Sequence, residues 1–168
     1  MIEGGVMEPS LYELARPLSL FVGLGIMASL FSIATFQPWH ITALIYAYTC
    51  YSAASLTALL LLEARRVYRD LLERLESKGQ LPAAPDPSLA VISGLFPPLT
   101  PLILANALWS LDIVAKLYAE EKSLYKPSIA KFTGSELAMA ALGFALPLLV
   151  SKFVSALNSV RANLLGQV

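Results

Sequence analysis

The sequence predicts an all-α polytopic membrane protein: a single domain, 1–168, with four hydrophobic helices arranged as two hairpins. Hydrophobic residues make up 57% of the 168 residues and charged residues 14%, whereas typical soluble domains have about 45–50% and about 25%. The stretch from Pro17 to Leu62 contains no Asp, Glu, Lys or Arg. Because the helices of a soluble domain keep one face polar, a charge-free stretch of this length indicates a lipid environment.

The first predicted hairpin occupies this stretch. A membrane-spanning helix needs about 20 apolar residues, and the stretch holds two such lengths, at about 18–36 and 41–62. The turn at 37–40 includes Trp39, whose amphipathic ring suits the headgroup level. Small residues let helices approach closely where lipid supplies no hydrophobic drive. We therefore expect helix packing at five small residues: Gly25, Ala28, Ser29, Ser32 and Gly143.

Hydroxyl groups concentrate in the first half of the second span, at Tyr46, Tyr48 and Tyr51. A buried tyrosine hydroxyl needs a hydrogen-bond partner, so we expect this face to point into the helix bundle. Such a cluster would also suit a cleft for a quinone or another flat ligand.

Helix two is predicted to leave the lipid as an amphipathic stalk, 63–78, because strong helix formers follow Leu62 without a break. Val67, Leu71 and Leu75 fall on its apolar arc, which must pack against the C-terminal helix of this chain or against a partner. The opposite arc offers a contact to a partner or to anionic headgroups. Its arginines are Arg65, Arg66, Arg69 and Arg74. The zero net charge argues against binding to nucleic acid.

The third hydrophobic helix follows a proline-rich connector, 80–87, and is predicted to be proline-kinked. Its first half contains three prolines: Pro97, Pro98 and Pro101. A proline inside a helix removes a hydrogen bond and clashes with the preceding turn. The span therefore runs either over 89–111 as a kinked helix or over 98–118, after a short re-entrant piece at 89–97.

The predicted topology follows from the distribution of positive charge. A loop at 120–136 separates the third span from the fourth, at about 137–157. Eight of the 12 Lys and Arg residues fall on the side that carries the stalk, and the cytoplasmic side of a membrane protein is the richer one. We therefore expect both termini and residues 63–87 on the cytoplasmic side, with the 120–136 loop on the other.

Polar residues in or beside the last two spans are candidates for transport or for ion pairing. They are Asn106, Asp112, Lys116 and Lys152. An ionisable residue at membrane depth suggests a functional site. However, Asp112 and Lys116 are four residues apart, which also suits an interfacial ion pair on one helix, and Lys152 can extend its side chain to the headgroups.

The sequence contains no motif for catalysis, a metal or a cofactor. It has a single His and a single Cys, too few for the usual Cys/His metal sites, and it lacks nucleotide-binding and metalloprotease motifs. We therefore expect a non-enzymatic structural protein that self-assembles as a homo-oligomer, or packs as a subunit, in a lipid-containing assembly such as a virion envelope or a membrane complex.

Two alternatives stay open from the sequence. One is a small ion or solute transporter or channel that uses the proline-broken third helix. The other is a quinone-contacting subunit of a redox complex. Asn, Gln and Cys are scarce in the chain, which is typical of proteins from a thermophile.

Overall fold

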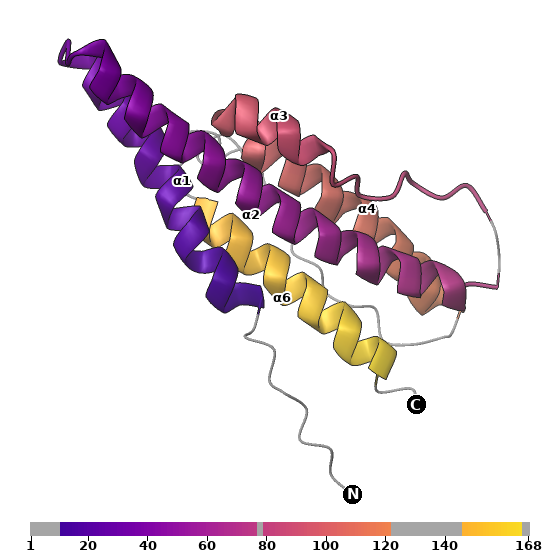
Figure 1. The fold of residues 1–168 in the computed structure, drawn as a ribbon. Coiled ribbons are helices and arrows are strands. Elements are labelled where there is room, and N and C mark those ends of the chain that lie inside the picture. The colour runs from indigo at the N-terminus through magenta and orange to yellow at the C-terminus, as the bar shows by residue number, and fades with distance from the viewer. Residues whose placement is uncertain (1–10, 77–78, 122–145, 166–168) are drawn as a thin grey trace, which may run out of the picture.

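The computed structural model describes residues 11–76, 79–121 and 146–165. These ranges are helical apart from turns and one extended connector, and they contain no strand. In chain order the elements are α1 (Leu11–Ala34), α2 (Trp39–Arg74), α3 (Leu89–Leu95), the short 3-10 helix η1 (Pro97–Leu99), α4 (Thr100–Glu121) and α6 (Leu146–Leu165), as Figure 1 shows. Three helices are long and apolar enough to cross a membrane, namely α1, α2 and the segment Pro97–Glu121.

α1 and α2 pack side by side as an antiparallel hairpin (Figure 1). α1 ends at Ala34, two residues before the predicted end of the first span. Phe36 has a left-handed backbone with φ 53°, and the N–H of Gln37 donates to the carbonyl of Ser32 at 3.0 Å. A left-handed residue followed by a bond of this kind closes many helix C-termini. α2 then begins at Trp39, so the turn is tight.

α2 is one continuous helix of 36 residues, which makes it about 54 Å long, and it changes packing partners along its length. Its N-terminal half packs against α1, while its C-terminal half packs against α4 and α6 (Figure 1). The largest fully buried side chains include Leu60, Leu61, Leu71, Leu104, Leu108, Leu111, Phe153 and Leu157. The main core therefore lies between the C-terminal half of α2, α4 and α6, and it extends to α1, which packs along α6.

The chain between Leu89 and Glu121 is divided into separate helices. α3 ends at Leu95, Phe96 has a non-helical backbone with φ −137° and ψ 88°, and η1 then leads into α4. A residue that precedes proline is disfavoured in the helical conformation, and Phe96 precedes Pro97. A kinked helix over 89–111 is therefore not formed, and the long helix begins close to the alternative start at 98.

α2 and α4 run in the same direction, which contradicts the predicted topology. Near the start of α4, Ser93 hydrogen-bonds to both Thr57 of α2 and Thr100 of α4. At the far end, the backbone N–H of Glu76 donates to Oε1 of Glu121 at 2.7 Å. The loop after α4 was predicted on the side opposite the stalk, yet it begins beside the stalk's end. The connector and α3 carry the chain back along α2, so α4 runs parallel to α2 (Figure 1).

Several predicted segments extend outside the described residues. They are the last two residues of the stalk, most of the 120–136 loop and the first part of the 137–157 span. α6 covers the rest of that span and continues to Leu165.

Candidate functional site

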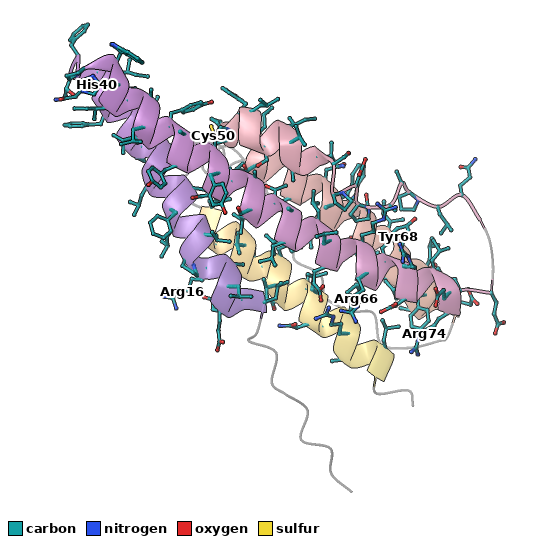
Figure 2. All side chains as sticks on the ribbon, viewed as in Figure 1. Arg16, His40, Cys50, Arg66, Tyr68 and Arg74 are labelled. Atoms are coloured by element: carbon teal, nitrogen blue, oxygen red, sulfur yellow. The ribbon has the colours of Figure 1, made fainter. Side chains whose placement is uncertain are left out.

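The α1–α2 hairpin exposes an apolar surface that extends to its turn (Figure 2). Its exposed large side chains are Leu14, Leu20, Phe21, Leu24, Leu30, Phe31, Ile33, Phe36, Trp39, Ile41, Leu44, Tyr46, Tyr48, Tyr51 and Leu62. Hydroxyls on the hairpin donate to carbonyls one turn back in their own helices, as Ser29 does to Gly25 and Thr49 does to Ile45, each at 2.8 Å. Internal satisfaction of polar groups is what a hydrocarbon environment requires, and an exposed apolar patch of this extent indicates an interaction surface.

Charged side chains begin on α2 where this surface ends. Glu63 forms an ion pair with Arg161 of α6. From there to the helix end α2 carries four exposed arginines: Arg65, Arg66, Arg69 and Arg74. Arg74 also donates from Nη1 to the carbonyl of Leu164 at 3.3 Å. The arginines predicted to contact a partner or headgroups therefore lie on the exposed side of the C-terminal half of α2. We call this half the charged half (Glu63–Arg74).

The apolar arc of the stalk packs within this chain. Val67, Leu71 and Leu75 are all buried in the main core, which α4 and α6 complete. The apolar arc was predicted to pack either within this chain or against a partner, and it packs within this chain. These three side chains are therefore not available to a separate partner.

The predicted packing residues of α1 lie in the hairpin. Gly25 faces Thr49 so closely that a Cβ on Gly25 would lie 2.1 Å from the Thr49 Oγ1. Ser29 and Ser32 are buried, and Ser32 hydrogen-bonds across the hairpin to Thr42 at 2.5 Å. Ala28 is half-buried, and Gly143 lies outside the described residues. Gly25 and Ser32 thus serve contacts within the hairpin.

The tyrosines of α2 do not share one inward face, and this prediction is wrong for two of them. Tyr48 and Tyr51 are 69% and 75% exposed, so they do not line a cleft inside the bundle. Tyr46 points toward α3, where its hydroxyl donates to the carbonyl of Leu95 at 3.1 Å. Successive residues of a helix are about 100° apart, so when α2 turns Tyr46 toward α3 it turns Tyr48 and Tyr51 away.

The structure separates the residues that were candidates for transport. Asp112 and Lys116 form an ion pair of 2.6 Å on α4, with side chains 15% and 44% exposed. Asn106 is exposed, and the half-buried Lys152 lies on α6. Thr100 lies near Thr57 through Ser93, and Glu121 bonds to Glu76. The ion pair is therefore level with the charged half of α2 and does not lie deep in the hairpin.

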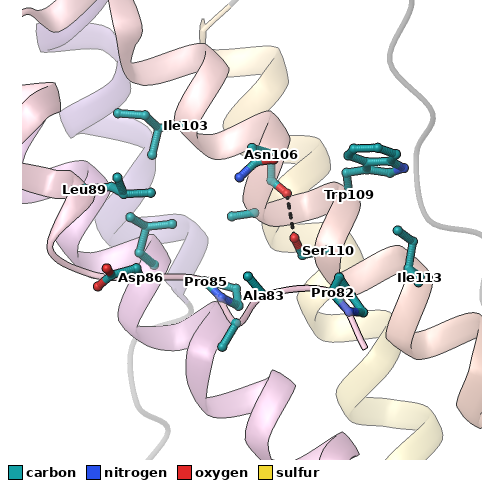
Figure 3. Close-up of a pocket in the computed structure, with 13 residues that line it drawn as sticks. Pro82, Ala83, Pro85, Asp86, Leu89, Ile103, Asn106, Trp109, Ser110 and Ile113 are labelled. Atoms are coloured by element: carbon teal, nitrogen blue, oxygen red, sulfur yellow. Dashed lines mark hydrogen bonds between the residues drawn. The ribbon is translucent and has the colours of Figure 1, made fainter. Parts of the chain in front are cut away.

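A cavity of about 430 Å³ lies between the connector and α4 (Figure 3). Its lining includes Pro82, Pro85, Leu89, Ile103, Asn106 and Trp109. Asp112 is not among the lining residues, so the cavity does not join it to Asn106. Asp86 also lines it, and the N–H and hydroxyl of Ser88 donate to its carboxylate at 3.0 and 2.7 Å. These bonds hold the pKa of Asp86 below its usual value. The short side chains of the connector are the signal that could have predicted this space.

Neutralising Asp112 is expected to have little effect. Because the ion pair is half-exposed at Lys116, Asp112→Asn should lower the free energy of unfolding by less than about 1 kcal/mol. Lys116→Gln removes the same ion pair, so it should lower the free energy of unfolding by the same amount. Denaturant titration in detergent micelles measures both variants. A loss above about 3 kcal/mol for Asp112→Asn alone would instead place its carboxylate in a water-excluded network.

Among the described residues, no group of three or more His, Cys, Asp or Glu side chains is placed to hold a metal ion. No family model, curated protein or solved structure matches this chain.

Proposed function

We propose that the chain is a non-enzymatic integral membrane protein with a structural role, packed as a subunit in a lipid-containing assembly. The observation that carries this proposal is the division of α2. Its N-terminal half belongs to a hairpin with an exposed apolar surface, and its charged half belongs to a bundle with exposed arginines. The hairpin is the membrane-spanning unit. The charged half of α2 lies on one side of the lipid, together with the parts of α4 and α6 that pack against it.

The length of the hairpin supports this placement. From Trp39 to Leu62 the helix is about 35 Å long, which covers a hydrocarbon layer of about 30 Å with a modest tilt. Trp39 and His40, both exposed, lie at one end of that length, where an amphipathic aromatic ring suits the headgroups. The ion pair of Glu63 with Arg161 lies at the other end.

α4 is long and apolar enough to cross a membrane, but its position favours a place mainly outside the layer that the hairpin spans. It lies beside the charged half of α2, whose exposed arginines are costly in hydrocarbon. In addition, two parallel spans would require the chain between them to cross the layer in the opposite direction. That chain includes the non-helical connector 79–88, and irregular backbone is not stable against lipid.

The segment from α3 through η1 into the start of α4 has the form of a re-entrant piece, which enters the lipid and leaves it on the same side. The exposed side chains there are apolar: Val91, Ile92, Leu95, Phe96 and Leu102. Gly94 lies against α2, where an added Cβ would be 3.0 Å from the Ala54 Cβ. α3 therefore lies beside the charge-free half of α2 and turns at Phe96, so the proposed chain crosses the membrane twice and dips into it once.

Site-specific labelling tests this topology. In a Cys50→Ser background, single cysteines at Gln37→Cys, Gln80→Cys and Glu120→Cys would be labelled in sealed vesicles with a membrane-impermeant maleimide. We expect Gln80→Cys and Glu120→Cys to react from the same side and Gln37→Cys from the opposite side. Labelling of Glu120→Cys together with Gln37→Cys would restore four crossings and contradict the proposal.

The subunit role has its own test. Extraction into polymer-bounded lipid discs, followed by mass measurement of the particles, should give more than one protein chain per particle. A single chain per particle across a range of protein-to-lipid ratios would contradict assembly. Release of the protein from membranes by an alkaline wash would contradict the membrane placement itself.

A further inference from the structure

One face of α2 is unpartnered along the hairpin and carries polar groups within its apolar surface. We define the outer stripe as Leu44, Tyr48, Tyr51, Ser55 and Leu62. These residues follow a spacing of four, three, four and seven, which keeps them on one side of a helix. All are exposed except Ser55, which is half-buried.

The two tyrosines of the outer stripe differ from the other tyrosines of α2. Tyr46 donates to the carbonyl of Leu95, and Tyr68 donates to the carbonyl of Pro82. Within the described part of the chain, the hydroxyls of Tyr48 and Tyr51 make no hydrogen bond. The tyrosines that face this chain are therefore satisfied by it, whereas those on the outer stripe are not.

The depth of these hydroxyls excludes water as their ordinary partner when the hairpin spans lipid. Tyr48 and Tyr51 lie nine and twelve residues after Trp39, or about 13 and 18 Å along the helix. That places them near the middle of a layer of about 30 Å. Acyl chains offer no hydrogen-bond acceptor, and an unsatisfied hydroxyl in such surroundings is costly. The outer stripe therefore suits a protein surface with hydroxyls or carbonyls at the same depth.

We propose that the outer stripe is the contact surface for a second copy of this chain. This deepens the proposed function and rests on it, because it requires the hairpin to be inserted in lipid. Two copies inserted with the same orientation are related by a two-fold axis along the membrane normal, so their α2 helices run parallel and the same residues meet. A hydroxyl both donates and accepts, so Tyr48 and Tyr51 can bond to the same stripe on the other copy.

The same face of α2 continues into the charged half. Arg69 and Glu73 extend the same face about two and three turns beyond Leu62, and Arg66 and Asp70 lie beside them. These four side chains are exposed, and within the described residues none forms an ion pair. In the two-fold pair each of these residues lies closest to its own copy, so Arg69 faces Arg69 and Glu73 faces Glu73, and like charges repel. The proposed contact is therefore confined to the outer stripe.

Disulfide trapping tests the contact in intact membranes. In the Cys50→Ser background, Leu62→Cys on the outer stripe is compared with Leu14→Cys on α1. The two positions are 57% and 47% exposed, and the contacts that join α1 to α2 place them at nearly the same level of the hairpin. Mild oxidation should give a disulfide-linked dimer with Leu62→Cys and none with Leu14→Cys.

Removal of the two hydroxyls tests the chemistry. Tyr48→Phe with Tyr51→Phe should raise the dimer dissociation constant in detergent micelles about tenfold, the scale of a few interhelical hydrogen bonds in a membrane. The double variant should leave the fold unchanged, because these hydroxyls bond to nothing in the described chain. Tyr46→Phe, which removes a bond within the chain, is the matched control and should leave the dissociation constant unchanged.

Five outcomes would overturn the inference, and the last would overturn the proposed function with it. Cross-linking through Leu14→Cys alone would put the contact on another face and leave the proposed structural role intact. A cross-linked species with a different protein would give the stripe another occupant. An unchanged dissociation constant for the double variant would remove the role of the hydroxyls. A single chain per lipid disc would exclude both the dimer and the assembly, while loss of the protein from washed membranes would overturn the proposed function at its base.

Discussion

Replacing Gly25 with leucine is expected to disrupt the α1–α2 hairpin and to lower the free energy of unfolding by about 3 kcal/mol, the upper end of the usual cost of overpacking. An added Cβ would lie 2.1 Å from the Oγ1 of Thr49 and 2.9 Å from its Cβ. The second distance matters more, because a change of rotamer cannot move the Thr49 Cβ. The two helices must therefore separate, and Ser32 and Thr42 would lose the hydrogen bond that joins them.

Three further variants separate steric crowding from a general effect of glycine. At Gly79 an added Cβ meets nothing within 4 Å, so Gly79→Ala should have little effect. Gly25→Ala should lower the free energy of unfolding by less than Gly25→Leu does. Adding Thr49→Ala to Gly25→Ala should restore part of the lost stability, because it removes the hydroxyl that the new Cβ would meet. Thermal or denaturant unfolding in detergent micelles measures all four. If Gly25→Leu and Gly79→Ala were equally stable, the close approach at Gly25 would not contribute to the fold.

The hairpin could be predicted because its signal does not depend on tertiary contacts. The stretch from Pro17 to Leu62 contains no charged residue. This composition indicates a lipid environment without any knowledge of how the helices pack. The close approach at Gly25 followed from the same reasoning, because small residues mark the places where two helices can come together. These predictions use only the local composition of the chain.

The direction of the tyrosines could not be predicted in the same way. The expectation that polar side chains point inward treats the bundle as the only source of partners. In the structure α2 has two sets of neighbours, and its rotation is set by Gly25 against Thr49 and by Gly94 against Ala54. That rotation leaves Tyr48 and Tyr51 on the outside. The rotation of a helix depends on its packing partners, which one sequence does not identify.

The relative direction of α2 and α4 could not be predicted from the sequence either. The count of positive residues assumes that each apolar segment crosses the membrane. The prolines at 97, 98 and 101 predicted a break, but they did not predict that α3 would return along α2 for only seven residues before the chain reversed. The contact between Glu76 and Glu121 reveals the error, since it joins two residues that the count had placed on opposite sides.

Removing the hydroxyl of Ser93 is expected to release the α3 segment from α2, at a cost of about 2–4 kcal/mol in the free energy of unfolding. The Ser93 hydroxyl bonds to Thr57 at 2.7 Å, to Thr100, and to the carbonyl of Ala53 at 3.3 Å. All three hydroxyl side chains are fully buried. Ser93→Ala therefore leaves two buried hydroxyls without their shared partner, and each such group costs about 1–3 kcal/mol. Denaturant titration in detergent micelles, followed by circular dichroism, measures the loss.

The matched control removes the whole cluster. In the triple variant Thr57→Val, Ser93→Ala and Thr100→Val, apolar groups of similar shape replace all three hydroxyls, so no buried donor or acceptor is left behind. The triple variant should therefore be more stable than Ser93→Ala alone, although it has lost more hydrogen bonds. The exposed Ser88, changed to alanine, should show a much smaller effect. If Ser93→Ala were as stable as the unaltered chain, the three hydroxyls would not be what holds α3 against α2.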